Sequence, residues 1–336
     1  MQRVVRQAPT SLAIGWAIML RTCAIVLVIL ATATLGSAGE KAIVLKHDGW
    51  VASVAFSPDS KTLASAGADN VVRLWEVGEW KGKGVLKGHG DCVTAVAISH
   101  DGKLILTGSY DRTWKLWDKD TLKPITGGGS HIVNCVAFKP TRNDFAVGDI
   151  TGTVNYYWLP NRDVKIDGPH VRSSHRSWVN GVAWNPSRFG LATASSDGTV
   201  HLWTSPLKKT PIVFQGGAGE VRCVAFNPRG TMFASGNRYG TVQVWEPVRN
   251  NVLATLTGHA SDVWSIAFSP DGKTLAAADT DWKKPSKVKL WDTETWKARG
   301  AFDTPGEILS IAYSPDGNWL AAGCWDKTVR VFRVEK

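Results

Sequence analysis

Short apolar strands recur along the chain at nearly constant spacing, and each runs into a polar turn. A typical strand, Val51–Phe56, is followed by Ser57-Pro58-Asp59, and a proline followed by an acid fits a tight hairpin turn. Successive strands begin 42, 40, 46, 42, 42 and 45 residues apart, at Val51, Val93, Val133, Val179, Val221, Val263 and Ile308. In the second repeat His100 stands where most of the others have proline. The pattern predicts seven structural repeats.

Two further strands are predicted in each repeat. The second strand is rich in small residues, as in Thr62–Ser65, and a polar turn leads into a third strand with an aromatic end. The aromatic residues are Trp75, Trp117, Tyr157, Trp203, Trp245, Trp291 and Phe332. Repeats of 40–45 residues, with Gly-His near the start and Trp followed by an acid near the end, resemble the WD-repeat family. The resemblance covers residues 41–336.

This resemblance implies an all-β fold, a seven-bladed β-propeller of four-stranded antiparallel blades, over residues 39–336. Such a blade is apolar on both faces, so it is stable only when neighbouring blades bury it. The last repeat ends one strand short, at Val329–Phe332, and a spare strand, Ala42–Leu45, precedes the first repeat. We therefore expect the N-terminal strand to complete the last blade and close the ring.

The resemblance also implies a hydrogen-bond network of His, Ser or Thr, Asp and Trp within a blade. Read without the repeats, such a set suggests a hydrolase triad. Because the set recurs and no G-x-S-x-G elbow presents a nucleophile, we interpret it as a buried structural network. Three blades carry the full set: His47, Ser65, Asp69 and Trp75; His89, Thr107, Asp111 and Trp117; His175, Thr193, Asp197 and Trp203.

The other four blades depart from the set. The sixth keeps His259 and Trp291, but an insertion near Asp279 and Asp281 leaves open which acid belongs to it. The remaining departures are Thr151 at the Asp position of the third blade, Gly217 and Tyr239 at the His and Asp positions of the fifth, and Ala322 and Phe332 beside Asp326 in the seventh.

The family arrangement implies that the loops before the first strand and after the second strand share one face of the ring. The candidate partner-binding residues on it are Trp50, Asp91, Tyr110, Trp178, Tyr239, Trp282 and Trp325. Exposed aromatics among charges are typical of protein contact sites, although Trp50 and Trp178 have half-burial as an alternative. The longest loop, about 160–177, is expected to add a basic rim to this face.

The N-terminal segment has the features of an export signal. Arg21 is followed by an apolar stretch, Cys23–Leu35, and then by Gly36-Ser37-Ala38. This order predicts a signal peptide over residues 1–38, cleaved after Ala38, with a start at either Met1 or Met19. The protein is then periplasmic or extracellular. The alternative is a membrane anchor formed by the same segment without cleavage.

Charge and composition narrow the function further. The 336 residues carry a net charge of +10, with the basic residues scattered among acids, so a nucleic-acid groove is disfavoured. No zinc, haem or phosphate-loop pattern occurs, so the sequence predicts no metal, no cofactor and no catalytic residue. The third positions of the inner strands are small: Ser53, Ala95, Cys135, Gly181, Cys223, Ser265 and Ser310.

The sequence therefore predicts a monomeric, exported, non-enzymatic scaffold that binds a protein or peptide. Its contact with a membrane, if any, is through an uncleaved signal. Two alternatives remain open: a propeller that binds carbohydrate or cell wall through its exposed tryptophans, and an enzyme with a site in the central channel.

Overall fold

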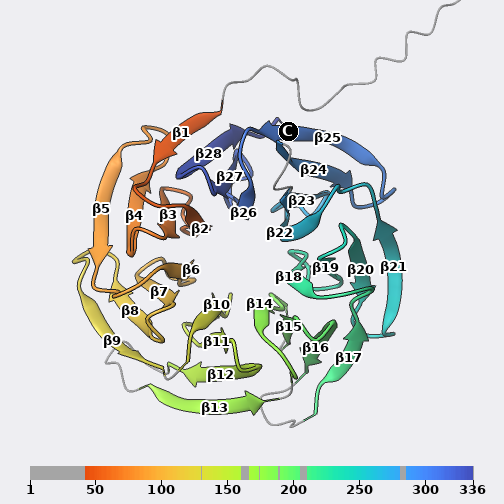
Figure 1. Cartoon of the computed structure of the whole chain (residues 1–336), viewed down its shortest axis with the longest axis horizontal. Helices are drawn as coiled ribbons and strands as arrows, with labels where there is room; N and C mark the ends of the chain where they lie inside the picture. The colour runs from red at the N-terminus through yellow and green to blue at the C-terminus, as the bar shows by residue number, and fades with distance from the viewer. Residues whose placement is uncertain are drawn as a thin grey trace, which may run out of the picture. The chain divides into compact units, whose positions relative to one another are not determined.

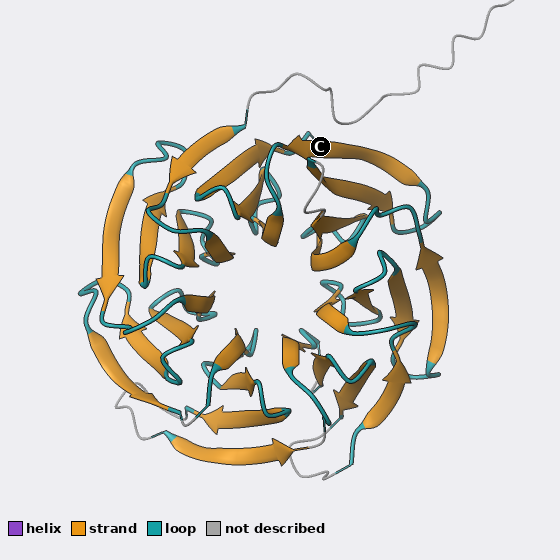
Figure 2. Ribbon diagram, in the orientation of Figure 1, coloured by secondary structure: helices purple, strands orange, loops and turns teal. Residues whose placement is uncertain are grey.

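The structure is a computed structural model that describes residues 42–129, 131–159, 166–173, 175–187, 190–204, 210–280 and 285–335. Those residues contain 28 β-strands and no helix (Figure 2). In these ranges, accordingly, no helix has the length and apolar character needed to span a bilayer. The predicted signal peptide and Trp282 lie outside the described residues.

The strands form seven four-stranded antiparallel sheets arranged as blades around a central axis (Figure 1). The innermost strands are β2 (Val51–Phe56), β6 (Val93–Ile98), β10 (Val133–Phe138), β14 (Val179–Trp184), β18 (Val221–Phe226), β22 (Asp262–Phe268) and β26 (Ile308–Tyr313). The second strands are β3 (Thr62–Gly67), β7 (Leu104–Ser109), β11 (Phe145–Asp149), β15 (Leu191–Ser195), β19 (Phe233–Asn237), β23 (Thr274–Thr280) and β27 (Trp319–Cys324). The predicted seven-bladed propeller is confirmed.

The third and outer strands complete each blade. The third strands are β4 (Val71–Glu76), β8 (Trp114–Asp118), β12 (Thr153–Trp158), β16 (Thr199–Trp203), β20 (Val242–Glu246), β24 (Ser286–Asp292) and β28 (Thr328–Arg333). The outer strands are β5 (Gly82–Lys87), β9 (Pro124–Gly128), β13 (Asp167–Ser173), β17 (Ile212–Gln215), β21 (Asn251–Leu256), β25 (Ala298–Thr304) and β1 (Ile43–Lys46).

The two ends of the propeller meet in one blade. Strand β1 pairs antiparallel with β28, with Val44 opposite Arg330 and Leu45 opposite Val329, and so supplies the outer strand of the seventh blade. The inner strands β2 and β26 also lie side by side, which closes the ring. This is the closure that the spare N-terminal strand predicts.

The hydrophobic core is divided into seven parts, each shared by two adjacent blades. The part between the first and second blades, for example, joins Leu74 and Leu86 to Val93, Ile105 and Trp117. Each fully buried leucine of this kind contributes about 1.5–3 kcal/mol to the free energy of unfolding. Because no blade has a core of its own, the blades stabilise one another, as in other repeat proteins.

Part of the predicted loop 160–177 differs from its predicted role, while residues 160–165 lie outside the described residues. Residues Asp167–Ser173 are not part of a long loop on the binding face but form β13, the outer strand of the third blade, paired with β12. This strand therefore lies along the perimeter of the ring, not on the loop face. Every blade needs a fourth strand to cover its third. Charged residues are common on such edge strands, so the charged sequence of this segment did not indicate a strand.

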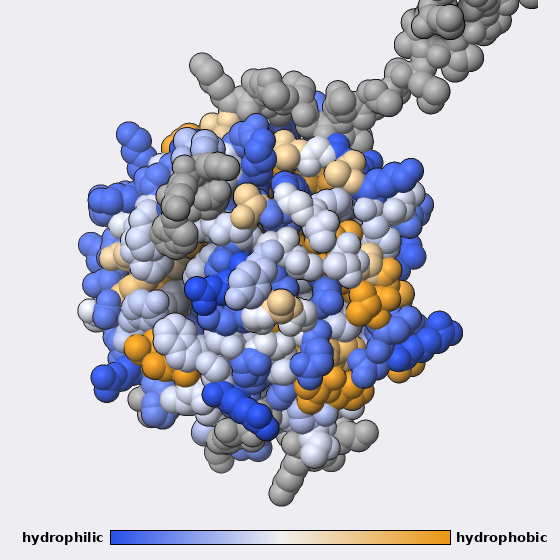
Figure 3. Space-filling model, turned by 45° about the vertical axis from the view of Figure 1, so that its right-hand side comes forward, coloured by the Kyte–Doolittle hydropathy of each residue, from blue (hydrophilic) through white to orange (hydrophobic). Residues whose placement is uncertain are grey.

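Figure 3 shows one side of the molecule as mainly hydrophilic, with apolar residues in separate patches. Exposed apolar side chains lie on the outer strands β17 and β21, where they include Ile212, Val213, Val252 and Leu253. Scattered exposed apolar residues of this kind are ordinary on soluble proteins.

Candidate interaction face at the channel mouth

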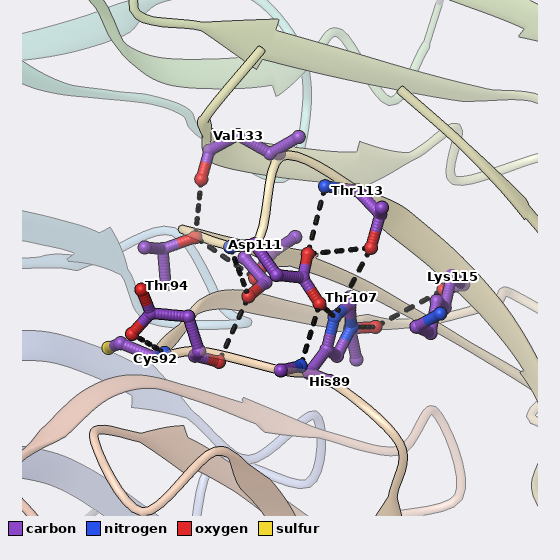
Figure 4. Close-up of polar contacts among 12 residues, drawn as sticks. His89, Cys92, Thr94, Thr107, Asp111, Thr113, Lys115 and Val133 are labelled. Atoms are coloured by element: carbon purple, nitrogen blue, oxygen red, sulfur yellow. Dashed lines mark hydrogen bonds and ion pairs between the residues drawn. The ribbon is translucent and has the colours of Figure 1, made fainter. Parts of the chain in front are cut away.

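A complete polar network lies inside the second blade, and Figure 4 shows its His89, Thr107 and Asp111. The Nδ1 of His89 lies 2.7 Å from Asp111, its Nε2 lies 2.7 Å from the Thr107 hydroxyl, and the Trp117 indole N–H donates to that hydroxyl at 2.9 Å. The donor and acceptor roles along this series of hydrogen bonds follow from its two ends, because a carboxylate only accepts and an indole only donates. Thr107 then donates to a neutral imidazole, which donates to Asp111.

The first and fourth blades bring the same residue types together. His47 contacts Asp69 at 3.1 Å and Ser65 at 2.7 Å, and the Trp75 indole donates to Ser65 at 2.7 Å. In the fourth blade, His175 lies 3.0 Å from Asp197 and 2.8 Å from Thr193, beside the buried Trp203.

The electrostatics of the network favour a neutral imidazole at His89 and His175 and ionised carboxylates at Asp111 and Asp197. Burial lowers the pKa of His89, and the opposing effect of Asp111 does not restore it. Burial alone raises the pKa of Asp111, but hydrogen bonds from Thr113, Gly90 and His89 outweigh burial and hold it well below the usual range. Similar hydrogen bonds lower the pKa of Asp197 to about 2. A neutral imidazole bound on both nitrogens is a structural group and has no free site for general-base catalysis.

In the sixth blade the structure decides which acid belongs to the network. Asp279 lies 3.2 Å from Nδ1 of His259 and also accepts a hydrogen bond from the backbone of Lys287. Ala277 occupies the Ser or Thr position, and the buried Nε2 of His259 and Nε1 of Trp291 have no hydrogen-bond partner among the described residues.

The third, fifth and seventh blades use other arrangements. In the fifth, Asn237 replaces the missing imidazole: its Oδ1 accepts from the backbone N–H groups of Tyr239 and Thr241, and its amide donates to Gly216. In the third blade Asp149 accepts from Thr151 in the same way. In the seventh, Arg330 pairs with Asp326 at 2.8 Å.

One group of side chains in the described part of the chain has the spacing of a metal site: His175, Asp197 and His201. Its geometry disfavours an ion. The two imidazoles stack with their centroids 3.8 Å apart and their planes 17° apart, so their lone pairs do not converge. Asp197 and Thr193 already occupy both nitrogens of His175. Burial first and His175 second lower the pKa of His201 to about 4.

The central channel is shaped by a β-bulge that recurs in all seven inner strands. In six strands the pairing register shifts between the first and third residues, as between Val51 and Ser53, and in β22 it shifts between Val263 and Ser265, so the residue between the two has no partner. A bulge re-aims the unpaired side chain. The bulged residues are Ala52, Thr94, Asn134, Asn180, Arg222, Trp264 and Leu309, and all line the channel cavity.

The third residues of the same strands link neighbouring blades. Ser53 accepts a hydrogen bond from the backbone of Val96 at 3.2 Å, and the Cys223 thiol lies 3.4 Å from the carbonyl of Val263. Burial raises the pKa of Cys223 to about 12 and also raises that of Cys135, so both are unreactive thiols at neutral pH.

Aromatic side chains surround the mouth of this cavity, which has a volume of about 550 Å³. Trp50 and Trp325 stack with centroids 4.9 Å apart and planes 11° apart, so Trp50 is half-buried against its neighbour. Trp178 is 51% exposed, Trp325 43% and Tyr110 42%. Four of the seven candidate residues thus converge on one cavity, although they come from four separate parts of the sequence.

The other three candidates do not line this cavity among the described residues. Asp91 is exposed and accepts a hydrogen bond from the backbone of Cys92. Tyr239 is 67% exposed and packs over Gly219, where a Cβ would lie 2.4 Å from its ring. Trp282 lies outside the described residues.

Sequence reasoning missed two residues of the cavity, Arg222 and Trp264. The Arg222 guanidinium lies 4.9 Å from the Trp264 ring centroid and is fixed by Asp262 at 3.1 Å and Glu220 at 2.7 Å. Because both acids pair with Arg222, they offset its positive charge at this point of the cavity wall. In the alignment both residues stand one position before the small third residues, but the sequence does not show that a bulge turns that position toward the axis.

The described residues that line the cavity include no His, Asp, Glu or Lys. Their titratable groups are Arg222, Tyr110 and two thiols, and burial, with Cys92 and Asp91 nearby, raises the pKa of Tyr110. This set offers stacking surface and hydrogen bonds rather than an acid–base pair.

Comparison with known proteins decides the family. The model of the family described as "WD domain, G-beta repeat" matches residues 39–76, 80–118, 168–204, 208–246, 250–292 and 297–333. The chain belongs to the WD40 family. The stretch 119–167 is outside these matches, and it contains most of the third blade, which lacks the His, Ser or Thr, Asp and Trp network.

WD40 relatives are similar to this chain over short stretches. A guanine nucleotide-binding protein subunit beta-like protein of Encephalitozoon cuniculi is 29% identical over 27% of this chain and 28% of its own length. Actin-related protein 2/3 complex subunit 1A of Arabidopsis thaliana is 34% identical over 22% of this chain and 20% of its own. A ribosome biogenesis protein WDR12 homolog of Nematostella vectensis is 42% identical over 17% and 15%. The aligned stretch is thus less than a third of each relative.

Proposed function

We propose that this WD40 propeller is a non-enzymatic scaffold that binds a protein or peptide at the mouth of its central channel. The observation that carries the proposal is the aromatic rim of Trp50, Tyr110, Trp178 and Trp325 around one cavity, with Arg222 and Trp264 in its wall. Tyr, Trp and Arg are the residues that dominate binding energy at protein interfaces. The name of the Arabidopsis relative, a subunit of a complex, supports a partner of this kind.

A pull-down with the full chain as bait tests the proposal. It compares substitutions at two exposed tryptophans on opposite faces of the ring. Trp178 lies at the channel mouth, whereas Trp158 ends the third strand β12, at the other face, and is 38% exposed. We expect a partner to be captured by the wild type and by Trp158→Ala but not by Trp178→Ala. Capture that is equal for all three chains, or lost only with Trp158→Ala, contradicts this site.

A carbohydrate ligand is the second candidate, because exposed indole rings such as Trp178 and Trp325 also stack on sugars. Binding of the full chain to purified polysaccharides, measured for the wild type and Trp178→Ala, separates the two ligands. Retention on a polysaccharide that Trp178→Ala abolishes would replace the protein partner with a glycan.

We further propose that the protein is exported as a monomer with its signal removed after Ala38. The support is the order of Arg21, the apolar stretch and Gly36-Ser37-Ala38. N-terminal sequencing from the native host should read Gly39-Glu40-Lys41. A chain that keeps residues 19–38 and sediments with membranes would establish the anchor instead.

A further inference from the structure

The third blade has a cavity in the place where other blades hold a buried imidazole. Counted back from the inner strand, Gly129 stands for His89, and Val147 and Tyr157 stand for Thr107 and Trp117. The loop after β9 is two residues shorter than the loop after β5, so His131, which follows Gly128 as His89 follows Leu86, is displaced from the imidazole position. A space of about 580 Å³ lies there between the second and third blades. Its lining includes Gly129 and the counterparts of four residues around His89 in the second blade: Gly128, Val147, Thr153 and Tyr157. The lining also includes His131, whose side chain is exposed.

The chain cannot fill this cavity from Gly129 itself. Its φ of 131° is disfavoured for any residue with a side chain, and a Cβ there would lie 2.4 Å from the carbonyl oxygen of Arg112. The fifth blade also lacks the imidazole, at Gly217, but there the amide of Asn237 occupies the place, 3.0 Å from where a Cβ would lie. The third blade has a carboxylate, Asp149, at the position of Asn237.

Asp149 lines the cavity and is only 4% exposed. Its Oδ1 accepts three hydrogen bonds, from the N–H and hydroxyl of Thr151 and the N–H of Thr153, at 2.6–3.1 Å. Its Oδ2 has no hydrogen bond, and no cation pairs with it, among the residues that the structure describes. Oδ2 is not one of the buried side-chain atoms that lack a partner, so it is accessible from the cavity and is suited to a cationic donor, which makes strong hydrogen bonds to a carboxylate.

Aromatic surface lies beside this carboxylate. Trp114 stands where the other blades have valine, as with Val72 and Val154, and its indole donates to the Tyr157 hydroxyl at 3.1 Å. The two rings have centroids 4.8 Å apart, and Trp114 lies against Gly128. Aromatic faces attract flat cations.

We propose that this cavity is a second binding site, distinct from the channel mouth, for a small planar cation with N–H donors. A guanidinium or imidazolium group fits: it places its N–H donors against Oδ2 of Asp149 and its flat face near Trp114 and Tyr157. The ligand thus supplies from outside an N–H donor like that of the imidazole in the first, second, fourth and sixth blades, and adds a positive charge opposite Asp149.

The test is a titration of the full chain with methylguanidinium and, separately, with neutral N-methylurea of similar shape, followed by chemical shifts of indole and backbone N–H groups. Methylguanidinium should shift resonances of Trp114 and Thr153, and N-methylurea should not. Equal binding of the neutral probe, shifts elsewhere only, or no shifts up to the concentration at which the protein unfolds would each overturn the proposal.

Two variants complete the test. Asp149→Asn should fold like the wild type, because Asn237 makes the same contacts in the fifth blade, and should bind about tenfold more weakly or worse for want of the charge. Asp120→Asn removes the same charge from a side chain that is 76% exposed and should bind like the wild type. Undiminished binding by Asp149→Asn would contradict the site.

Discussion

The second and sixth blades contain the same His–Asp pair and the same tryptophan, yet only one satisfies them. The imidazole and indole centroids lie 6.1 Å apart in the second blade and 6.4 Å apart in the sixth, with tilts of 60° and 55°. The rings are therefore placed alike. What differs is one hydroxyl: Thr107 links the two nitrogens in the second blade, and Ala277 leaves both without partners in the sixth.

This comparison separates two roles of the network. Ring placement follows from packing against the neighbouring blade and persists without the hydroxyl. Hydrogen-bond satisfaction depends on the hydroxyl, and leaving a buried donor or acceptor unpaired costs about 1–3 kcal/mol. The propeller tolerates that loss in one blade because its stability is spread over seven shared cores.

The largest effect is expected from removing the packing itself. Trp117→Ala should lower the free energy of unfolding by about 3–5 kcal/mol, because it empties a site that is 1% exposed and leaves Thr107 without its donor. Denaturant melts give the value. Trp178→Ala, at a side chain that is 51% exposed, is the control and should cost less than about 1 kcal/mol. Similar losses of unfolding free energy for the two variants would mean that the network and its packing do not stabilise the blade.

The next effect comes from making the second blade resemble the sixth. Thr107→Ala should cost about 2–3 kcal/mol, since it unpairs His89 Nε2 and the Trp117 indole and removes a buried methyl group. Chemical denaturation compares it with Thr126→Ala, a partly exposed threonine of β9. If the loss at Thr107 does not exceed that of the control, the hydroxyl contributes nothing beyond packing.

The fourth blade extends the comparison to pH. Its third strand adds His201, whose pKa is lowered to about 4 by burial and by the stacked His175. The unfolded chain takes up this proton near pH 6.5 and the folded protein only near pH 4, so stability falls as pH decreases between these values. From pH 7 to pH 5 the wild type should lose about 1–2 kcal/mol more than His201→Gln, which copies Gln243 of the fifth blade. Denaturant melts of both chains at pH 7 and pH 5 measure this difference. An equal loss of unfolding free energy in the wild type and in His201→Gln would refute the prediction.

The smallest effect is a gain. Ala277→Ser gives the sixth blade the hydroxyl of Ser65 in the first and should raise the free energy of unfolding by about 1 kcal/mol, because His259 and Trp291 regain a shared partner. Ala276→Ser, one residue earlier on the same strand, is the matched control and should destabilise the protein. A loss of stability at both positions would show that the sixth blade has no room for the hydroxyl.

Much of this architecture is determined by the sequence itself. Seven blades can be predicted from three features of the repeats: the spacing of Val51, Val93 and their counterparts, the turns after them, and the terminal aromatics. These features suffice because each repeat encodes the same local structure. The spare strand before His47 predicts the ring closure, and the pairing of β1 with β28 confirms it. The networks in the first, second and fourth blades likewise follow from repeated positions.

Other features exist only in the tertiary structure. The bulge that turns Arg222 and Trp264 into the channel has no residue signature, because it arises from pairing between strands. Strand β13 was hidden because an edge strand tolerates charge. Packing between blades decides which of two nearby acids contacts His259. It also decides that the third blade has a cavity beside Asp149, and neither result can be predicted from the sequence of one repeat.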